Sequence, residues 1–279
     1  MIIRLAVLGT SHVGTIYFAW EKIKHDYPQF EITFFAAPRK NYLRLQIGQD
    51  KTFGILDPSL FTPDEIAMMT QTYGATNIAL AGFDAVLIVG HETLESKLAG
   101  LIAAFSIDGK RPVPDQPRIS QAAYDALADD LARGTTLPEE WHHWDKPLVF
   151  ALPAPRVSER CRKEDAQDTI YGAWSRLANS TADASAKTLF EEHMDRIRVN
   201  FDAAGIQLLT PQQDVLAQNG LTHEKFCGGA VRLQSLEAYP ETDHKHMNTD
   251  YGLYTLPYLL GQIESQFDLS AALPPTEAE

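Results

Sequence analysis

The sequence predicts a single α/β domain, in which helices cover both faces of a five-stranded parallel sheet as a three-layer sandwich. Five short apolar runs rich in β-branched or aromatic residues are typical of buried strands. Segments with helical periodicity separate these runs, and such alternation favours parallel pairing. One elaborated α/β domain also commonly reaches 279 residues. The five predicted strands cover residues 2–9, 32–37, 85–90, 148–152 and 206–210.

The segments between the strands contain the predicted helices and two long connections. Helical periodicity is clearest in residues 13–25, 120–132, 184–204 and 251–263. Long connections in compact folds are often lids or binding loops. We therefore expect a domain over residues 1–269 with a long insertion around 92–146, and a second long helical connection over 157–205. The small, acidic, proline-containing segment 270–279 is expected to be a disordered tail.

Composition excludes several classes of function. A formal net charge of -13 would repel a phosphate backbone, so nucleic acid is not an expected partner. No apolar run is long enough to span a bilayer, and the opening run is too short for a signal peptide, which predicts a soluble cytoplasmic protein. Cys161 and Cys227 are the only cysteines, so there is no disulfide framework and no CxxC pair for zinc.

Polar residues follow each of the first four predicted strands. Ser11 follows the first strand, Arg39 the second, His91 the third and Arg156 the fourth. The carboxyl ends of parallel strands share one edge of the sheet, and ligands bind there near the switch in strand order. We expect the functional site at this edge.

Ser11 lies at a predicted strand-to-helix turn, within the segment Gly9-Thr10-Ser11-His12-Val13-Gly14. A serine at such a turn is beside free amide groups that can bind a developing oxyanion, as in a hydrolase with a serine nucleophile. The alternative is a helix N-cap, which is the commoner use of serine at this position.

Asp243 and His246 precede the last predicted helix and are three residues apart. At this spacing the carboxylate can accept a hydrogen bond from one imidazole nitrogen and leave the other free to deprotonate a serine. His246 would then be the general base and Asp243 its orienting partner. Alternatively, Asp243 is an N-cap or turn residue and His246 a surface histidine.

Together, these two segments resemble the SGNH, or GDSL-like, hydrolase family. That family has a serine just after the first strand and a D-x-x-H block near the carboxyl terminus, and Ser11 with Asp243 and His246 match both blocks. The resemblance implies a flavodoxin-like sandwich and ester hydrolysis without a cofactor or a metal. Family members commonly remove acyl groups from sugars, lipids or small esters. Some relatives transfer acyl groups to polysaccharides, and a non-catalytic member of the fold is a further alternative.

The resemblance also implies an oxyanion hole built from the serine amide, a glycine after the second strand and an asparagine after the third. Gly48 is the candidate glycine. Gly90-His91-Glu92 stands where the family has glycine-x-asparagine, so His91 is the candidate donor in place of the asparagine amide. The alternative for His91 is a loop histidine with its own hydrogen-bond partners.

Two other classes of site remain open at this point. Gly9-x-Ser11-x-x-Gly14 follows a strand and opens a helix, as the fingerprint of a nucleotide-binding Rossmann-like oxidoreductase does, although the middle glycine is replaced by serine. Arg39 would then suit a 2'-phosphate. A metal site formed by His244 and His246 is the second alternative, with a third ligand from His142 or His143.

Two residues are candidates for substrate binding. Trp141 lies in the aromatic and histidine cluster of residues 141–144 and would stack on a sugar ring, unless it anchors that connection to the core. Arg156 would meet a carboxylate on an acidic sugar, unless it forms a surface ion pair. The expected partner is a small-molecule or carbohydrate ester, and the sequence leaves the oligomeric state open.

Overall fold

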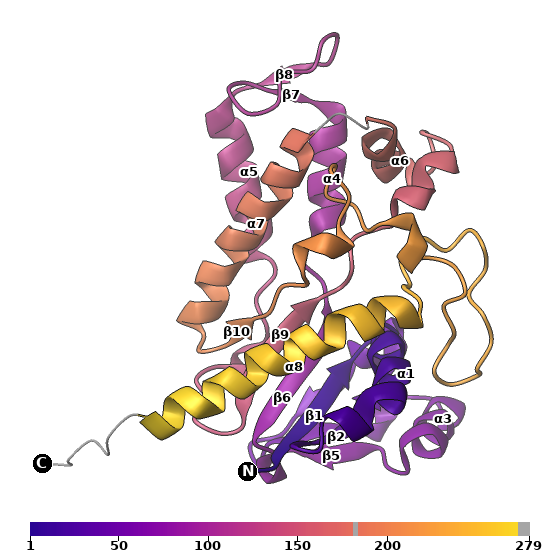
Figure 1. The fold of residues 1–279 in the computed structure, drawn as a ribbon, viewed down its shortest axis with the longest axis vertical. Helices are drawn as coiled ribbons and strands as arrows, with labels where there is room; N and C mark the ends of the chain where they lie inside the picture. The colour runs from indigo at the N-terminus through magenta and orange to yellow at the C-terminus, as the bar shows by residue number, and fades with distance from the viewer. Residues whose placement is uncertain (181–183, 273–279) are drawn as a thin grey trace, which may run out of the picture.

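The computed structural model describes residues 1–180 and 184–272. It contains a five-stranded, all-parallel sheet in the order β10-β9-β6-β1-β2, flanked by helices (Figure 1). The predicted fold class is therefore confirmed. The strands are β1 (Ile3–Gly9), β2 (Phe30–Ala36), β6 (Ala85–His91), β9 (Leu148–Pro153) and β10 (Gln207–Leu208).

The order of these strands creates a switch point beside the end of β1. Numbered along the chain, the five strands run 2-1-3-4-5 across the sheet. The second strand is therefore added on one side of β1, and the later strands are added on its other side. Such sheets bind ligands where the order reverses, between the first and third strands. Gly9 ends β1 with a φ of 152°, and a Cβ there would lie 2.1 Å from the carbonyl oxygen of Val89. This glycine lets the ends of β1 and β6 approach closely at the switch point.

Two helices cover one face of the sheet. Helices α1 (Val13–Ile23) and α8 (Thr249–Ala272) pack against each other and lie side by side in Figure 1, although they come from opposite ends of the chain. Alternate residues of the strands, such as Leu5 and Val7, face them, as the period of a strand requires. This packing brings the segment just before α8 to the turn just before α1.

The other face of the sheet carries smaller elements. Phe53, Trp141 and Phe201 pack there against Leu8 and Val86, which point away from α1. The segment between β2 and β6 supplies part of this cover, including a short antiparallel sheet of β3, β4 and β5 that the sequence did not predict. Its elements are α2 (Arg39–Tyr42), β3 (Gln46–Ile47), β4 (Thr52–Gly54), α3 (Pro63–Tyr73) and β5 (Asn77–Ala79).

The two long connections form a helical cap around a core of their own. Trp174 stacks on Phe190, and Tyr124 is fully buried beside them. In Figure 1 this cap fills the upper half of the molecule, beyond the carboxyl ends of the strands. Its elements are α4 (Glu95–Ala104), β7 (Ser106–Ile107), β8 (Arg118–Ile119), α5 (Gln121–Arg133), α6 (Gly172–Asn179) and α7 (Ala184–Ala203).

Among the described residues, no helix combines the length and apolar character needed to cross a bilayer. Helix α8 continues through residues 270–272, where the sequence suggested the start of a tail. The rest of that expected tail, residues 273–279, lies outside the described residues.

Candidate active site

Ser11 lies in the tight turn between β1 and α1. The amide of Val13 donates to the carbonyl of Thr10, and that of Gly14 donates to the carbonyl of Ser11, so the helix begins two residues after the serine. Within residues 1–180 and 184–272, the amides of Ser11 and His12 donate to no protein acceptor. The turn therefore supplies a hydroxyl group and two unused amide donors at the switch point.

Three side chains form a continuous hydrogen-bonded chain at this turn. The Ser11 hydroxyl lies 2.8 Å from Nε2 of His246, and Nδ1 of His246 lies 2.8 Å from Oδ2 of Asp243. The serine and the other two residues are more than 230 positions apart in sequence. The packing of α8 on α1 joins them, because His246 lies three residues before α8 and Ser11 two residues before α1.

Asp243 is held as an acceptor by the backbone that follows it. Its Oδ1 accepts hydrogen bonds of 2.9 Å from the amides of Lys245 and His246, which leaves Oδ2 for the imidazole. Burial acts to raise the pKa of Asp243, but the hydrogen bonds from the His246 ring and from the two amides outweigh it and hold that pKa well below its usual range. Asp243 is therefore a carboxylate at neutral pH, as a partner that orients a histidine base must be.

Two rings stack on the imidazole of His246. The Tyr239 ring lies 3.8 Å away between centroids, with an interplanar angle of 9°. The His12 ring lies 5.0 Å away. Burial is the main reason that the pKa of His12 falls to about 3, so this ring is neutral and adds no positive charge beside His246. The guanidinium of Arg232 lies 4.8 Å from the centroid of the Tyr239 ring.

His244, one of the two residues between Asp243 and His246, anchors this segment to the helical cap. Nε2 of the buried His244 ring lies 2.6 Å from Oε1 of Glu164, and the His244 amide donates to the hydroxyl of Tyr171. The amide of Ser158 donates to the His244 carbonyl. The segment 243–246 thus makes two kinds of contact: Asp243 and His246 form the hydrogen-bonded chain with Ser11, while His244 binds the cap.

A cavity, called the triad cavity after the linked side chains of Ser11, His246 and Asp243, opens beside Ser11 and His246 at the carboxyl edge of the sheet. Arg39, which follows β2, and Glu92, which follows β6, both line it and form an ion pair with each other. Gly90 is required close by, because its φ is 78° and a Cβ there would lie 2.4 Å from Oγ1 of Thr10. The end of β6 therefore packs directly against the serine turn.

The structure does not bring the two other predicted oxyanion donors to this cavity. The amide of Gly48 donates to the carbonyl of Thr52 within the turn between β3 and β4. His91 follows an irregularity in the pairing of β6 with β9, and its Nε2 bonds to the carbonyl of Thr135, which does not line this cavity. Both groups are thus already hydrogen-bonded elsewhere, which corrects their predicted role.

The two predicted substrate-binding residues differ in their surroundings. Trp141 is 4% exposed and packs against Phe53 and Trp144, so it anchors its connection to the core and does not face a ligand. Arg156 lines the triad cavity, but it is not in a surface ion pair. Its guanidinium is buried and donates to Glu95 at 2.7 Å.

The alternative metal site is not assembled. His244 binds Glu164 and His246 binds Asp243, while His142 bonds to the carbonyl of Leu137. Nowhere in the part of the chain that the structure describes do three or more histidine, cysteine or acidic side chains gather as metal ligands would.

The sequence did not indicate two residues that build this site. Tyr239 and Glu164 lie in irregular segments, where no periodic pattern indicates which way a side chain points. Arg39 was expected at this edge from its position after the second strand, but its ion pair with Glu92 was not predicted.

No protein-family model matches this chain, and no curated protein matches it. Among solved structures, the chain is similar to the periplasmic domain of a lipopolysaccharide acetyltransferase from Salmonella ser. Paratyphi A. The two are 9% identical with a TM-score of 0.39, over 95% of this chain and 84% of that chain. Because this likeness is weak, we infer the chemistry of the site from its geometry and not from the similar structure.

Proposed function

We propose that the chain is a serine esterase or deacylase that cleaves an acyl ester through a covalent acyl-enzyme. The observation that carries this proposal is the unbroken chain from Ser11 through His246 to Asp243, with 2.8 Å at each step. A serine hydroxyl is a weak nucleophile unless an adjacent base takes its proton, and an imidazole oriented by a carboxylate is such a base.

In the first half of the reaction, Nε2 of His246 takes the proton of the Ser11 hydroxyl while Oγ forms a bond to the ester carbonyl carbon. The tetrahedral intermediate then collapses, the bond to the alcohol oxygen breaks, and His246 returns the proton to that alcohol. In the second half, His246 takes a proton from water, and the hydroxide formed attacks the acyl carbon. The bond to Ser11 Oγ then breaks, the carboxylic acid leaves, and His246 returns the proton to Oγ.

The amides of Ser11 and His12 are the proposed donors to the oxyanion. They are the two donors at the turn without a protein acceptor among the described residues. Preorganised amides contribute strongly because they do not reorient during the reaction. Arg39 is a third candidate, since its guanidinium lines the same cavity where the family resemblance would place a glycine amide.

The dinucleotide alternative fits this site less well. A pyrophosphate must approach the backbone where a Rossmann fingerprint has its middle glycine. Here that position is Ser11, whose side chain is engaged with His246. Arg39, which would hold a 2'-phosphate, is paired with Glu92.

Turnover of p-nitrophenyl acetate tests the proposal. We expect a burst of nitrophenol that equals the enzyme concentration, followed by slower steady hydrolysis, and an acetyl adduct on Ser11 in the mass of the intact protein. The His246→Ala variant serves as the control that lacks the base. A native protein that gives neither the burst nor the adduct would refute the proposal.

A further inference from the structure

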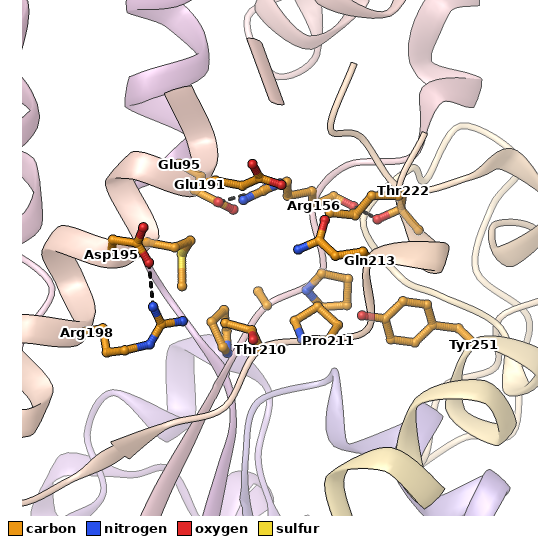
Figure 2. A pocket seen from close by; sticks show the side chains of 15 residues that line it. Glu95, Arg156, Glu191, Asp195, Arg198, Thr210, Pro211, Gln213, Thr222 and Tyr251 are labelled. Atoms are coloured by element: carbon orange, nitrogen blue, oxygen red, sulfur yellow. Dashed lines mark hydrogen bonds and ion pairs between the residues drawn. The ribbon is translucent and has the colours of Figure 1, made fainter. Parts of the chain in front are cut away.

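A second pocket adjoins the triad cavity behind the buried pair formed by Arg156 and Glu95 (Figure 2). Both side chains line both cavities, as do Ala154 and Pro155. The pair is 9% and 8% exposed, and a second donation from Arg156 to the carbonyl of Gly220 fixes it. The two cavities thus share one rigid wall at the carboxyl edge of the sheet.

The remaining walls of this second pocket come from three elements. Helix α7 contributes Met194 and Asp195, the segment after β10 contributes Thr210 and Gln213, and the first turn of α8 contributes Tyr251. Because α8 begins three residues after His246, the catalytic segment and one wall of this pocket are continuous in the chain.

The charges around the pocket neutralise one another. Arg156 pairs with Glu95 and Arg198 pairs with Asp195, as Figure 2 shows. Glu191 lies 3.8 Å from Lys187, one turn earlier on α7. A charged ligand would therefore find no unpaired counter-ion among the described lining residues. The pocket favours an uncharged ligand.

The polar groups left over are neutral hydrogen-bonding groups. Figure 2 shows the hydroxyl of Tyr251 and the amide of Gln213 directed into the cavity, with Thr210 beside them. Burial raises the pKa of Tyr251, so its hydroxyl stays protonated and can donate. The apolar part of the lining consists of prolines, Met194 and Leu216. A cavity volume of about 120 Å³ is space for one ring-sized group.

We propose that this second pocket binds an uncharged, hydroxyl-bearing ring, such as a neutral sugar residue. Hydroxyl groups exchange hydrogen bonds with tyrosine, threonine and glutamine side chains, while the C-H faces of the ring pack on proline and methionine. Its relation to the triad rests on the proposed function: a sugar held on the far side of the shared wall from Ser11 is a residue next to the one that carries the ester.

Binding is tested on the full chain carrying Ser11→Ala, so that no turnover interferes. The probes are glucose and glucuronate, which differ only at C6, where glucose has a hydroxymethyl group and glucuronate a carboxylate. Saturation-transfer NMR measures their affinities. We expect glucose to bind in the millimolar range and glucuronate several-fold more weakly. Tyr251→Phe and Gln213→Ala should each weaken glucose binding about 2- to 10-fold, the effect of one lost neutral hydrogen bond.

Gln212→Ala is the matched control, since this neighbouring glutamine does not line the pocket. It should leave the affinity for glucose unchanged. Equal or tighter binding of glucuronate, no binding of either probe, or glucose binding that both pocket variants leave unaltered would each overturn the proposal. A failure of the proposed esterase function would not overturn the binding proposal, because binding is measured on a variant that lacks Ser11.

Discussion

On one side of the triad cavity the side chains of His246 and Asp243 are 19% and 17% exposed, whereas on the other side those of Arg39 and Glu92 are 63% and 48% exposed. The first pair is fixed by backbone amides, by the Tyr239 ring and by the anchor of His244 to Glu164. The second pair consists of two long side chains in solvent. The side proposed to transfer protons is thus held rigidly, while the side proposed to stabilise charge is free to adapt.

Loss of the nucleophile should have the largest effect. Ser11→Ala removes the proposed nucleophile, so kcat for p-nitrophenyl acetate should fall by about 10⁴ to 10⁶. Ser96→Ala is the matched control, because Ser96 lines the same cavity without touching the triad. It should stay within a few-fold of the native rate. Comparable losses in both variants would contradict the assignment of Ser11.

Loss of the orienting charge should come next. Asp243→Asn keeps the shape of the side chain but no longer favours the required tautomer of His246, so kcat should fall about 10⁴-fold. Asp250→Asn, a surface change in the first turn of α8, is the control. A loss below tenfold in the Asp243 variant would show that the carboxylate does not orient the base.

The same carboxylate should make stability depend on pH. The pKa of Asp243 is lower in the folded chain than in the unfolded one, so its contribution to the free energy of unfolding is fully present above the unfolded pKa of about 4. This contribution is lost as pH falls through the lower folded pKa. Urea unfolding of the native chain and of Asp243→Asn should therefore differ most at neutral pH and converge in acid. A constant difference from pH 7 to pH 3 would contradict this.

Removal of the ring that stacks on the base should have a moderate effect. Tyr239→Leu takes away a π face that stabilises the imidazolium formed during the reaction, an interaction worth about 0.5 to 2 kcal/mol. We expect kcat to fall about 3- to 10-fold with little change in KM. Tyr239→Phe keeps the ring and should retain most of the rate. If the two variants lost the same activity, the hydroxyl and not the ring would be the important group.

The exposed side of the cavity should respond least. Arg39→Ala should lower kcat/KM only a few-fold, because solvent screens a guanidinium that is 63% exposed. Lys40→Ala, which removes a neighbouring surface charge, should have no effect. A loss above about 100-fold in Arg39→Ala would mean that this side is as preorganised as the triad.

The sheet could be predicted because its central strands β1, β6 and β9 are buried on both faces and form nearly continuous apolar runs. Strands β3, β4 and β5 were missed because a strand of only two or three residues is too short to show a periodic pattern. Likewise, the cap arises from two connections far apart in sequence, and nothing in either segment shows that they share one core.

In the site, Ser11, Asp243 and His246 could be named as candidates from their residue types, from the three-residue spacing of Asp243 and His246, and from a resemblance to the SGNH family in two sequence blocks. Gly48 and His91 were chosen from chain order, and local geometry places them elsewhere. The pairing at the end of β6 is irregular, and His91 bonds there to the carbonyl of Thr135; a shift of one residue in register can reverse the face of a side chain. Tyr239 reaches His246 through the fold of an irregular loop that has no pattern to read.

Labelling with a fluorophosphonate, read from the mass of the intact protein, tests the central claim most directly. The reagent reacts with a serine whose hydroxyl is activated by a neighbouring base. The account predicts one adduct on the native chain, located on Ser11, with no adduct on Ser11→Ala and much slower labelling of His246→Ala. An unlabelled native protein, or an adduct that persists in Ser11→Ala, would contradict it.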